Sequence, residues 1–377
     1  MSKVWLSSPH LGKKEIEYVN EAFSTNWIAP LGPNVDAFEN QISNYLNVKE
    51  AVSLSSGTAA LHLALLTCGV KQNDIVLCQS FTFAASAFPI EYLGAQPVFI
   101  DSEKETWNMD PLLLEESITD YIKIGKKPAA VIVVHLYGMP AKMNEIVAIC
   151  AKYDIPIIED AAEALGSVYD DKKCGSIGKI GILSFNGNKI ITTSGGGALI
   201  SNHSEIINKV RHISAQAKES APYYLHKEIG YNYRMSNVCA GIGRGQMEVL
   251  NDRVHKRREI FEVYHKELKD INGLHFLDEP KGSFSNRWLT TVVFDPTVFK
   301  KETNEKIRKG LESVNIETRP LWKPLHQQPV FKSCKAYLNG VSDYLFENGL
   351  CLPSGSNMND DVLSLIIKEI RIQLSNG

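Results

Sequence analysis

Residues 157–197 contain the feature that most constrains this chain: two short apolar segments that each end in polar side chains. The first ends in Glu159 and Asp160, and the second, residues 181–185, leads into Lys189 and a glycine-rich turn at 192–197. A short apolar run of this kind is typical of a buried parallel strand. Ligands of open α/β sheets bind at the carboxyl ends of strands. We therefore expect Asp160 and Lys189 to lie close together at one sheet edge, beside a flexible loop.

A carboxylate and a lysine in this arrangement suit the chemistry of pyridoxal 5'-phosphate (PLP). The lysine amine forms a Schiff base, and the acid keeps the ring nitrogen protonated so that the ring can accept electrons. The positive ring would lower the proton affinity of Lys189, which could then act as a base. The Ser184 hydroxyl, five residues before Lys189, could bind the phosphate. The alternative is an exposed lysine and an aspartate that caps the next helix, because most lysines are exposed.

Residues 51–58 form a predicted strand that turns into a helix over 59–68. The junction contains Ser56, Gly57 and Thr58, and such a junction presents free backbone N–H groups and hydroxyls to an anion. We interpret these three residues as the binding site of the PLP phosphate. Because serine and threonine are also favoured as helix N-caps, an ordinary cap is the alternative.

Three segments carry a resemblance to a known family: DAAEALGS at 160–167, SFNGNK at 184–189 and TSGGG at 193–197. They resemble the DegT/DnrJ/EryC1/StrS sugar aminotransferases, PLP enzymes of fold type I, and the resemblance extends from Leu6 to about Ser354. It implies an α/β fold with a large PLP-binding domain, 1–250, and a smaller C-terminal α/β domain, 251–377. Strand–helix alternation from 51 to 200 itself predicts a doubly wound sheet, with 199–200 as an edge strand.

The resemblance also implies roles for single residues. Phe83, rather than Phe81, would stack on the cofactor ring, and Glu163 would meet the phenolic oxygen, where many relatives have glutamine. Asn232 in the YNYRM segment would reach the phosphate bound by the partner subunit, which implies a homodimer with shared active sites. The alternatives are core packing for the phenylalanines and a helix start with buried aromatics around Asn232. Asn186 departs from the histidine of many relatives.

Substrate contacts are expected in two further segments. The resemblance places the loop with Asn26, Ile28 and Ala29 beside the sugar, although a packing loop is an equal alternative. In the segment IETRPLWKPLH, residues 316–326, Arg319 and His326 could bind phosphates, a carboxylate or the sugar. His135 follows another predicted strand and could touch a ligand or be a hydrogen-bonded structural residue.

A closer resemblance concerns the substrate. STNWIAPLG, EDAAEALGS, NGNKIITTSGGG, SNRWL and IETRPLWKPLH look like the enzymes of UDP-N-acetylbacillosamine synthesis. This implies transfer of the amino group of L-glutamate to C4 of a UDP-2-acetamido-2,6-dideoxy-4-ketohexose for glycan synthesis. The alternatives are a GDP- or dTDP-linked ketosugar, a PLP-dependent sugar dehydratase, in which histidine replaces the lysine, and a non-catalytic PLP-binding regulator. The presence of Lys189 argues against the dehydratase.

Composition excludes other classes of function. A net charge of −3 without a basic tract argues against a nucleic-acid partner. No apolar run reaches the roughly 18 residues of a membrane span, and the first residues lack the apolar core of a signal peptide. The seven cysteines show no zinc-like spacing with each other or with histidine, so we expect no metal site and reduced thiols in a cytoplasmic enzyme.

Overall fold

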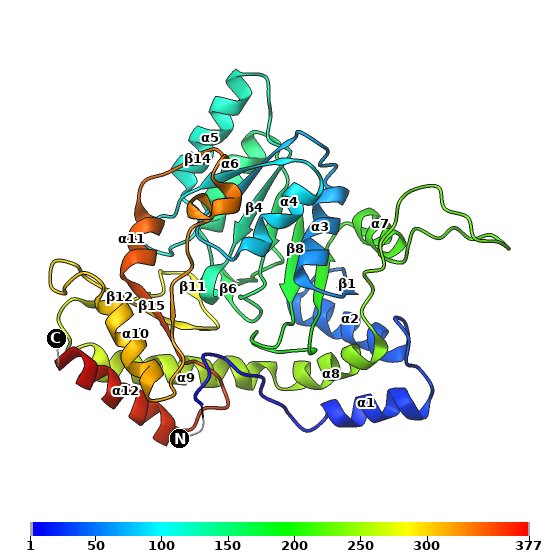
Figure 1. Ribbon diagram of the computed structural model, residues 1–377. Helices are drawn as coiled ribbons and strands as arrows, with labels where there is room; N and C mark the ends of the chain where they lie inside the picture. Colours follow the sequence, from blue (N-terminus) through cyan, green and yellow to red (C-terminus); the bar gives the residue numbers. More distant parts are fainter. Residues whose placement is uncertain (1–2, 376–377) are drawn as a thin grey trace.

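An eight-stranded mixed sheet forms the centre of the computed structural model, which describes residues 3–375 (Figure 1). Five neighbouring pairs, from β8 across to β14, are parallel, whereas β9 runs antiparallel to both of its neighbours. In spatial order the strands are β1 Glu50–Leu54, β9 Gly197–Ser201, β8 Ile180–Ser184, β5 Ile157–Asp160, β4 Ala130–Val134, β2 Ile75–Gln79, β3 Gln96–Ile100 and β14 Ala336–Tyr337.

Helices cover both faces of this sheet because its strands are apolar on both sides. Val76 and Ile132 face one core cluster, which includes residues of α3 Gly57–Thr67, α4 Phe88–Tyr92 and α7 Ser204–Ser214. Their chain neighbours Leu77 and Val131 face the opposite cluster, which includes residues of α5 Pro111–Lys123 and α6 Met143–Lys152. This alternation is the pattern of a buried, doubly wound sheet, so the predicted α/β fold is confirmed.

A second, four-stranded antiparallel sheet lies beyond residue 250, in the order β10 Leu274–Phe276, β12 Thr290–Phe294, β15 Gly349–Leu352 and β13 Arg319–Pro320. Its core includes residues of α9 Leu250–Leu268, α10 Thr303–Ser313 and α12 Asp360–Ser375. Between β13 and β15 the chain returns to the large sheet. There β14 pairs with β3, and Phe331 packs in a core cluster of that sheet. A domain boundary at residue 250 stays a proposal. Within residues 3–375, no helix combines the length and apolar character needed to cross a membrane.

Two local predictions were wrong. Residues 199–200 do not form an edge strand, because β1 pairs with the outer side of β9 and itself forms the edge. Asn232 does not begin a helix: it lies in an extended segment that pairs with Ala215. The helix α8, Asn237–Glu248, starts only after Ser236, whose hydroxyl accepts a hydrogen bond from the Cys239 N–H.

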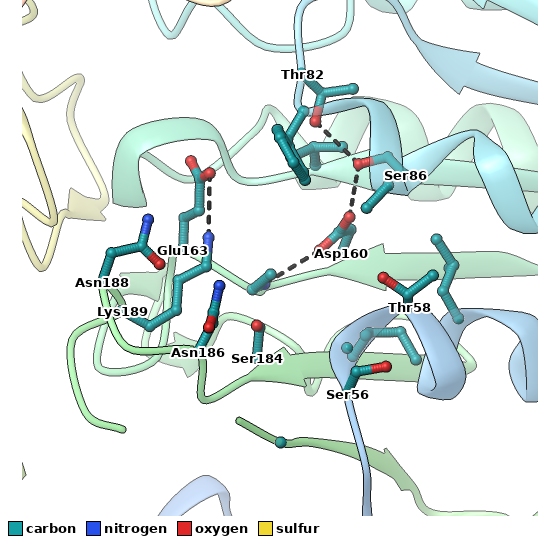
Figure 2. Close-up of a pocket in the computed structure, with 18 of the residues that line it drawn as sticks. Ser56, Thr58, Thr82, Ser86, Asp160, Glu163, Ser184, Asn186, Asn188 and Lys189 are labelled. Atoms are coloured by element: carbon teal, nitrogen blue, oxygen red, sulfur yellow. Dashed lines mark hydrogen bonds and ion pairs between the residues drawn. The ribbon is translucent and has the colours of Figure 1, made fainter. Parts of the chain in front are cut away.

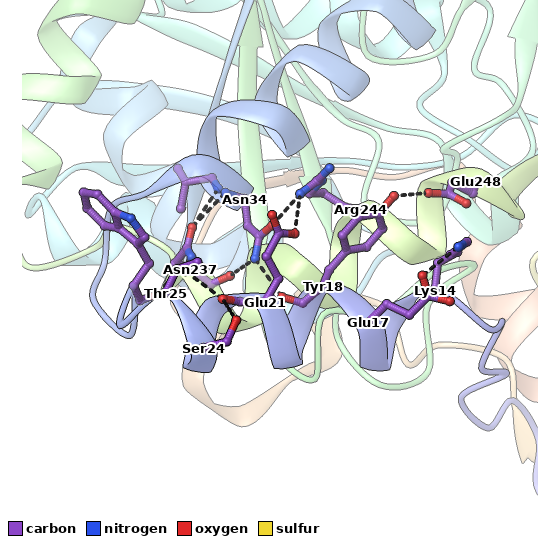
Figure 3. A network of polar contacts seen from close by, with 12 residues as sticks. Lys14, Glu17, Tyr18, Glu21, Ser24, Thr25, Asn34, Asn237, Arg244 and Glu248 are labelled. Carbon is purple, nitrogen blue, oxygen red and sulfur yellow. Dashed lines mark hydrogen bonds and ion pairs between the residues drawn. The ribbon is translucent and has the colours of Figure 1, made fainter.

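Two helices at the start of the chain, α1 Glu15–Ser24 and α2 Pro33–Leu46, pack beside α8 (Figure 3). The loop between them is held by Asn237, which is 1 % exposed. Its side-chain amide donates to Trp27 O (2.9 Å), its backbone N–H donates to Ala29 O (2.8 Å), and its Oδ1 accepts from the backbone N–H groups of Asn34 and Val35. Asn237 therefore caps α2 and fixes the backbone of the preceding loop.

Candidate active site

A cavity of about 330 Å³ lies at the carboxyl ends of β4, β5 and β8 and at the first turn of α3 (Figure 2). This is the sheet edge at which ligands are expected in an open α/β fold. Eight predicted site residues line it together: Ser56, Gly57, Thr58, Phe83, Asp160, Glu163, Ser184 and Lys189. Asn186, Asn188, Trp288 and Trp322 also line it.

Asp160 ends β5 and is 8 % exposed. Its Oδ2 accepts a hydrogen bond from Ser86 Oγ (2.7 Å), and its Oδ1 accepts one from the Ala162 N–H (3.2 Å). Thr82 Oγ1 lies 3.0 Å from Ser86 Oγ and extends this chain of hydroxyls. The carboxylate is thus fixed in orientation at the cavity wall. Ser86 and Thr82 were not predicted as site residues from the sequence. The only feature there that could have indicated them is their spacing of four residues around a short turn after β2.

Behind Asp160, His135 and Glu159 form a fully buried pair. The Ala141 N–H donates to His135 Nδ1 (3.1 Å), so Nε2 carries the proton and donates to Glu159 Oε2 (2.9 Å). Glu159 also accepts from the Gly175 N–H (2.9 Å). His135 does not line the cavity and therefore corresponds to the structural alternative.

The Lys189 amine lies inside the cavity wall, with its side chain only 11 % exposed, so the exposed-lysine alternative is wrong. Its Nζ is 3.4 Å from Glu163 Oε1 and 4.3 Å from the centroid of the Trp288 ring. The carbonyl of the preceding residue, Asn188, accepts from Trp288 Nε1 and from Ser7 Oγ, each at 2.7 Å. These contacts position the lysine from the second domain and the N-terminal segment.

Glu163 uses its second oxygen, Oε2, to accept the Tyr137 N–H (2.7 Å). Burial raises the pKa of the Glu163 carboxyl above its ordinary value, while the nearby Lys189 ammonium opposes part of that rise. Asp160, on the other side, raises the pKa of Glu163 further. Glu163 is therefore a buried acid beside the lysine amine, with a pKa above its ordinary value.

Another wall of the cavity is formed by the first turn of α3. Ser56 Oγ accepts the Ala59 N–H (3.0 Å), so the N-cap alternative is correct for this hydroxyl. The N–H groups of Gly57 and Thr58 lie in the first turn of α3, where backbone donors have no partner within the helix. A Cβ atom on Gly57 would lie 3.1 Å from Ser184 Cβ, so glycine permits the close approach of α3 to β8. Such a helix start suits an anion.

These groups fit PLP in both chemistry and order. Figure 2 shows Lys189 and Asp160 at opposite ends of the cavity, with Glu163 on one side and Ser184 and Ser56 on the other. In PLP the aldehyde carbon lies opposite the ring nitrogen, between the phenolic oxygen and the phosphate arm. Lys189, Asp160, Glu163 and the α3 turn can each face the matching group.

Aromatic side chains line the cavity beyond the catalytic groups. Phe83 is 56 % exposed, and its ring centroid lies 5.8 Å from that of Trp322. Trp322 in turn stacks on Tyr137, with the ring centroids 6.1 Å apart. Phe81, by contrast, is fully buried and lies outside the cavity wall, as expected for a core residue.

The remaining predicted residues do not line this cavity: Asn26, Ile28, Ala29, Asn232, Arg319 and His326. The ring of His326 is held by Ser80 Oγ (2.8 Å) and Asp343 Oδ1 (2.9 Å), which gives it a packing role. Arg319 pairs with Glu317 at 2.8 Å and lines an adjoining cavity. The loop with Asn26 and the segment with Asn232 lie outside the cavity of their own chain.

Comparison with known proteins gives a consistent result. The family model of the DegT/DnrJ/EryC1/StrS aminotransferases matches residues 9–371. EpsN of Bacillus subtilis, whose name classes it provisionally as a PLP-dependent aminotransferase, is 51 % identical over 97 % of this chain and 94 % of its own length. GDP-perosamine synthase of Escherichia coli O157:H7 is 36 % identical over 98 % of each chain.

Two further matches concern the substrate and the cofactor. UDP-4-amino-4,6-dideoxy-N-acetyl-beta-L-altrosamine transaminase of Campylobacter jejuni is 32 % identical over 94 % of this chain and 93 % of its own length. Among solved structures, the PLP form of Spr1654 from Streptococcus pneumoniae, whose name classes it provisionally as a sugar aminotransferase, superposes with a TM-score of 0.91 at 25 % identity, covering 99 % of each chain.

Proposed function

Because the chain belongs to the DegT/DnrJ/EryC1/StrS aminotransferase family, and is thus a PLP-dependent sugar aminotransferase, we propose a specific reaction for it. The enzyme transfers the amino group of L-glutamate to C4 of a UDP-2-acetamido-2,6-dideoxy-4-ketohexose and so makes a UDP-4-amino sugar for glycan synthesis. The observation that carries the amino transfer is the position of Lys189 and Asp160 at opposite ends of one cavity. A dehydratase is disfavoured because Lys189 is intact.

PLP supplies an aldehyde that takes up the amino group and a ring that accepts electrons when bound. The chain supplies the proton transfers and the orientation. With PLP bound, Lys189 Nζ would be the group that takes a proton from the α-carbon of the amino donor and returns it to the aldehyde carbon of the cofactor, across the nitrogen that joins the two carbons. Asp160, oriented by Ser86 and the Ala162 N–H, provides the negative charge that keeps the ring nitrogen protonated. Glu163 would lie near the phenolic oxygen, and the α3 turn would hold the phosphate.

The choice of UDP rests on the sequence segments that resemble N-acetylbacillosamine enzymes and on the Campylobacter jejuni relative that acts on a UDP-linked sugar. A GDP-linked ketosugar is the second candidate, because GDP-perosamine synthases are 36 % and 34 % identical to this chain. Arg319 lines a cavity that shares Asn188, Trp288 and Trp322 with the PLP cavity, so it could bind a phosphate of either nucleotide.

A homodimer is part of the proposal. The loop before α2 exposes Trp27, Ile28 and Leu31, and the segment after α7 exposes Tyr223, Tyr224 and Ile229. Figure 1 shows this second segment extending away from the large sheet. Exposed apolar side chains that gather on such segments favour an interface, and two-fold symmetry is the commonest arrangement for identical chains. In the dimer Asn232 would reach the partner's phosphate, and Asn26, Ile28 and Ala29 would approach its sugar.

A cytoplasmic location completes the proposal. All seven cysteines are free thiols in the structure, and four of them are buried. Free cysteines without a disulfide are typical of a reducing compartment. The amino donor and nucleotide sugars are also small polar metabolites of that compartment.

A panel of ketosugars tests the function. The PLP-loaded enzyme is incubated with ¹⁵N-labelled L-glutamate and with UDP-, GDP- and dTDP-linked 4-ketosugars, and products are analysed by mass spectrometry. We expect ¹⁵N only in the product of the UDP-2-acetamido-2,6-dideoxy sugar, with Lys189→Ala as the inactive control. Labelling of the GDP-linked sugar alone would replace the proposed substrate by the second candidate. Absence of label from every sugar, together with normal reaction with L-glutamate, would exclude all three.

A further inference from the structure

A short segment of the second domain, residues 285–288, contacts both loops that carry the amine and the acid of the PLP cavity. Glu163 lies in the turn after β5 and Lys189 in the turn after β8, so the two side chains come from different loops of the large sheet. Their contact, Nζ to Oε1 at 3.4 Å, depends on how these loops are placed relative to each other. Asn286, which is fully buried, forms hydrogen bonds with the Glu163 loop.

Asn286 holds the Glu163 loop by its backbone. Its Nδ2 donates to Glu163 O and to Leu165 O, each at 2.9 Å, and its own backbone N–H donates to Ser167 Oγ at 2.9 Å. Ser167 Oγ in turn donates to Gly138 O at 2.7 Å. A Cβ atom on Gly138 would overlap Asn286 Oδ1, so glycine at this position leaves the space that Asn286 fills. One side chain from the second domain therefore fixes the turn that carries Glu163.

The same side chain also fixes the aromatic ring beside the lysine. Asn286 Oδ1 accepts the Trp288 N–H at 2.9 Å, while Trp288 Nε1 donates to Asn188 O at 2.7 Å. The Trp288 ring lies 4.3 Å from Lys189 Nζ. Between Asn286 and Trp288, Arg287 has a φ of 52°, a left-handed conformation that is unfavourable for a residue other than glycine. Such strain persists where the surrounding structure enforces it, and it is concentrated at functional sites.

We propose that Asn286 is a positioning residue for the amino transfer, which sets the distance between Glu163 and Lys189 from the second domain. Asn286 does not line the PLP cavity, so it acts through its neighbours and touches neither cofactor nor substrate. This rests on the proposed roles of Glu163 and Lys189 and is independent of which sugar accepts the amino group. A misplaced pair should slow the reaction at saturating L-glutamate without weakening the binding of L-glutamate.

The test variant is Asn286→Asp, which keeps the size of the side chain. One carboxylate oxygen can still accept the Trp288 N–H. The other oxygen stands against the carbonyls of Glu163 and Leu165, where the wild type has a donor. The substitution therefore removes the connection to the Glu163 loop and keeps the one to Trp288.

The matched control is Asn304→Asp in α10. Asn304 Nδ2 also donates to two backbone carbonyls, Glu347 O at 3.0 Å and Gly349 O at 3.3 Å, and its Oδ1 accepts the Glu305 N–H at 2.9 Å. Asn304 is buried in the second domain and does not line the PLP cavity. The control thus makes the same chemical change at a site remote from the amine and the acid.

Two measurements separate positioning from a general loss of stability. The absorbance change of bound PLP on rapid mixing with L-glutamate gives the limiting rate and the half-saturating concentration of the donor. Amide hydrogen exchange at Tyr137 is measured in the cofactor-free protein, because the Tyr137 N–H donates to Glu163 Oε2 and so reports where that carboxylate lies. Thermal unfolding of each variant gives the loss of stability that a purely structural role would cause.

For Asn286→Asp we expect the limiting rate to fall at least ~10-fold, with the half-saturating concentration unchanged within about twofold. Exchange at Tyr137 should become roughly tenfold faster, for the loss of about one hydrogen bond. Asn304→Asp should lower the melting temperature by a similar amount and leave both the limiting rate and the Tyr137 exchange at their wild-type values.

A folded Asn286→Asp protein with the wild-type limiting rate overturns the inference, since Asn286 then has only a structural role. A slower reaction with unchanged Tyr137 exchange also overturns it, because Glu163 has then kept its place. If Asn286→Asp does not fold, Ser167→Ala takes its place, because it removes the hydroxyl between Asn286 and Gly138 and keeps the Asn286 amide.

Ser167→Ala should slow the limiting rate roughly threefold and speed up exchange at Tyr137, and wild-type values of both would overturn the inference. A wild type that does not react with L-glutamate contradicts the proposed function instead. In that case the Tyr137 exchange of the same variants still tests whether Asn286 positions Glu163, because it is measured without cofactor or substrate.

Discussion

The PLP cavity and the outer segments differ in how completely their side chains find partners within one chain. We define the outer segments as α1, the loop 25–32 and residues 215–236. In the cavity, both oxygens of Asp160 accept hydrogen bonds, and both oxygens of Glu163 have partners. In the outer segments, Asn237 holds the loop 25–32 through Trp27 O, and within residues 215–236 the Gln216 N–H donates to Tyr231 O. This last segment nevertheless exposes apolar side chains such as Tyr224 and Ile229, which are 82 % and 83 % exposed. Order without burial indicates a surface kept for contact with another chain.

The largest effect is expected in the cavity. Lys189→Ala should abolish turnover, because no other amine lines the cavity within the described residues. Borohydride treatment followed by peptide mapping should find PLP fixed to Lys189 in the wild type and to no residue in the variant. Lys173→Ala, a lysine outside the cavity, serves as the control and should react normally. Reduced cofactor on a different lysine of the wild type would break the assignment.

Asp160→Asn should have the next largest effect. The amide oxygen can keep the bond from the Ala162 N–H while the amide NH2 donates to Ser86 Oγ, but the side chain lacks the charge that keeps the ring nitrogen protonated, so we expect a loss in kcat of at least ~100-fold. PLP should still bind, which its absorbance reports. Ser86→Ala, which removes one hydrogen bond and keeps the charge, is the milder companion, with a loss of about tenfold or less. Near-normal turnover in Asp160→Asn would show that the carboxylate has no such role.

The cavity could be predicted from the sequence because its residues follow local rules. Asp160 and Lys189 stand directly after apolar strands, and Ser56, Gly57 and Thr58 lie at a strand–helix junction, so short motifs and sheet geometry place them together. Ser86, Trp288 and Trp322 were missed because they reach the cavity through tertiary packing, although Trp288 and Trp322 stand in the segments SNRWL and IETRPLWKPLH that carry the resemblance. The predicted edge position of residues 199–200, which belong to β9, was wrong because the strand order depends on pairing with β1, which is distant in sequence.

In the outer segments, Asn237→Asp should loosen the loop without disturbing the cavity. The aspartate can still cap α2 through Asn34 and Val35, but it cannot donate to Trp27 O and instead places an oxygen against it. Amide hydrogen exchange should therefore speed up in residues 25–32 by roughly tenfold, for the loss of about one hydrogen bond. Tyr18→Phe, which removes only the bond to Glu248 in the same network, is the control and should leave the loop unchanged (Figure 3). Unchanged exchange in Asn237→Asp would show that other contacts hold the loop.

The smallest effect concerns the stability of the cofactor-free protein. Burial raises the pKa of Glu163 above its ordinary value of 4.5, so the folded state binds more protons than the unfolded state in the window above that value. The stability that this group contributes is complete below the unfolded pKa and is lost as pH rises through the folded pKa. Compared with Glu163→Gln, the wild type should lose on the order of 1–2 °C in Tm between about pH 5 and about pH 8. A wild type that gains Tm relative to the variant over this range would contradict the assigned direction.

The central claim is that Lys189 and Asp160 of one chain work with Asn232 of its partner. The most direct measurement mixes inactive Lys189→Ala chains with inactive Asn232→Asp chains, whose added charge would repel the phosphate. In a mixed dimer one site receives both changes and the other receives neither. Random mixing gives half mixed dimers with one intact site each, so glutamate-dependent amination of the UDP-4-ketosugar should recover to roughly one quarter of wild type. Verified mixed dimers without recovered activity would mean that Asn232 acts in its own chain or has no part in the site.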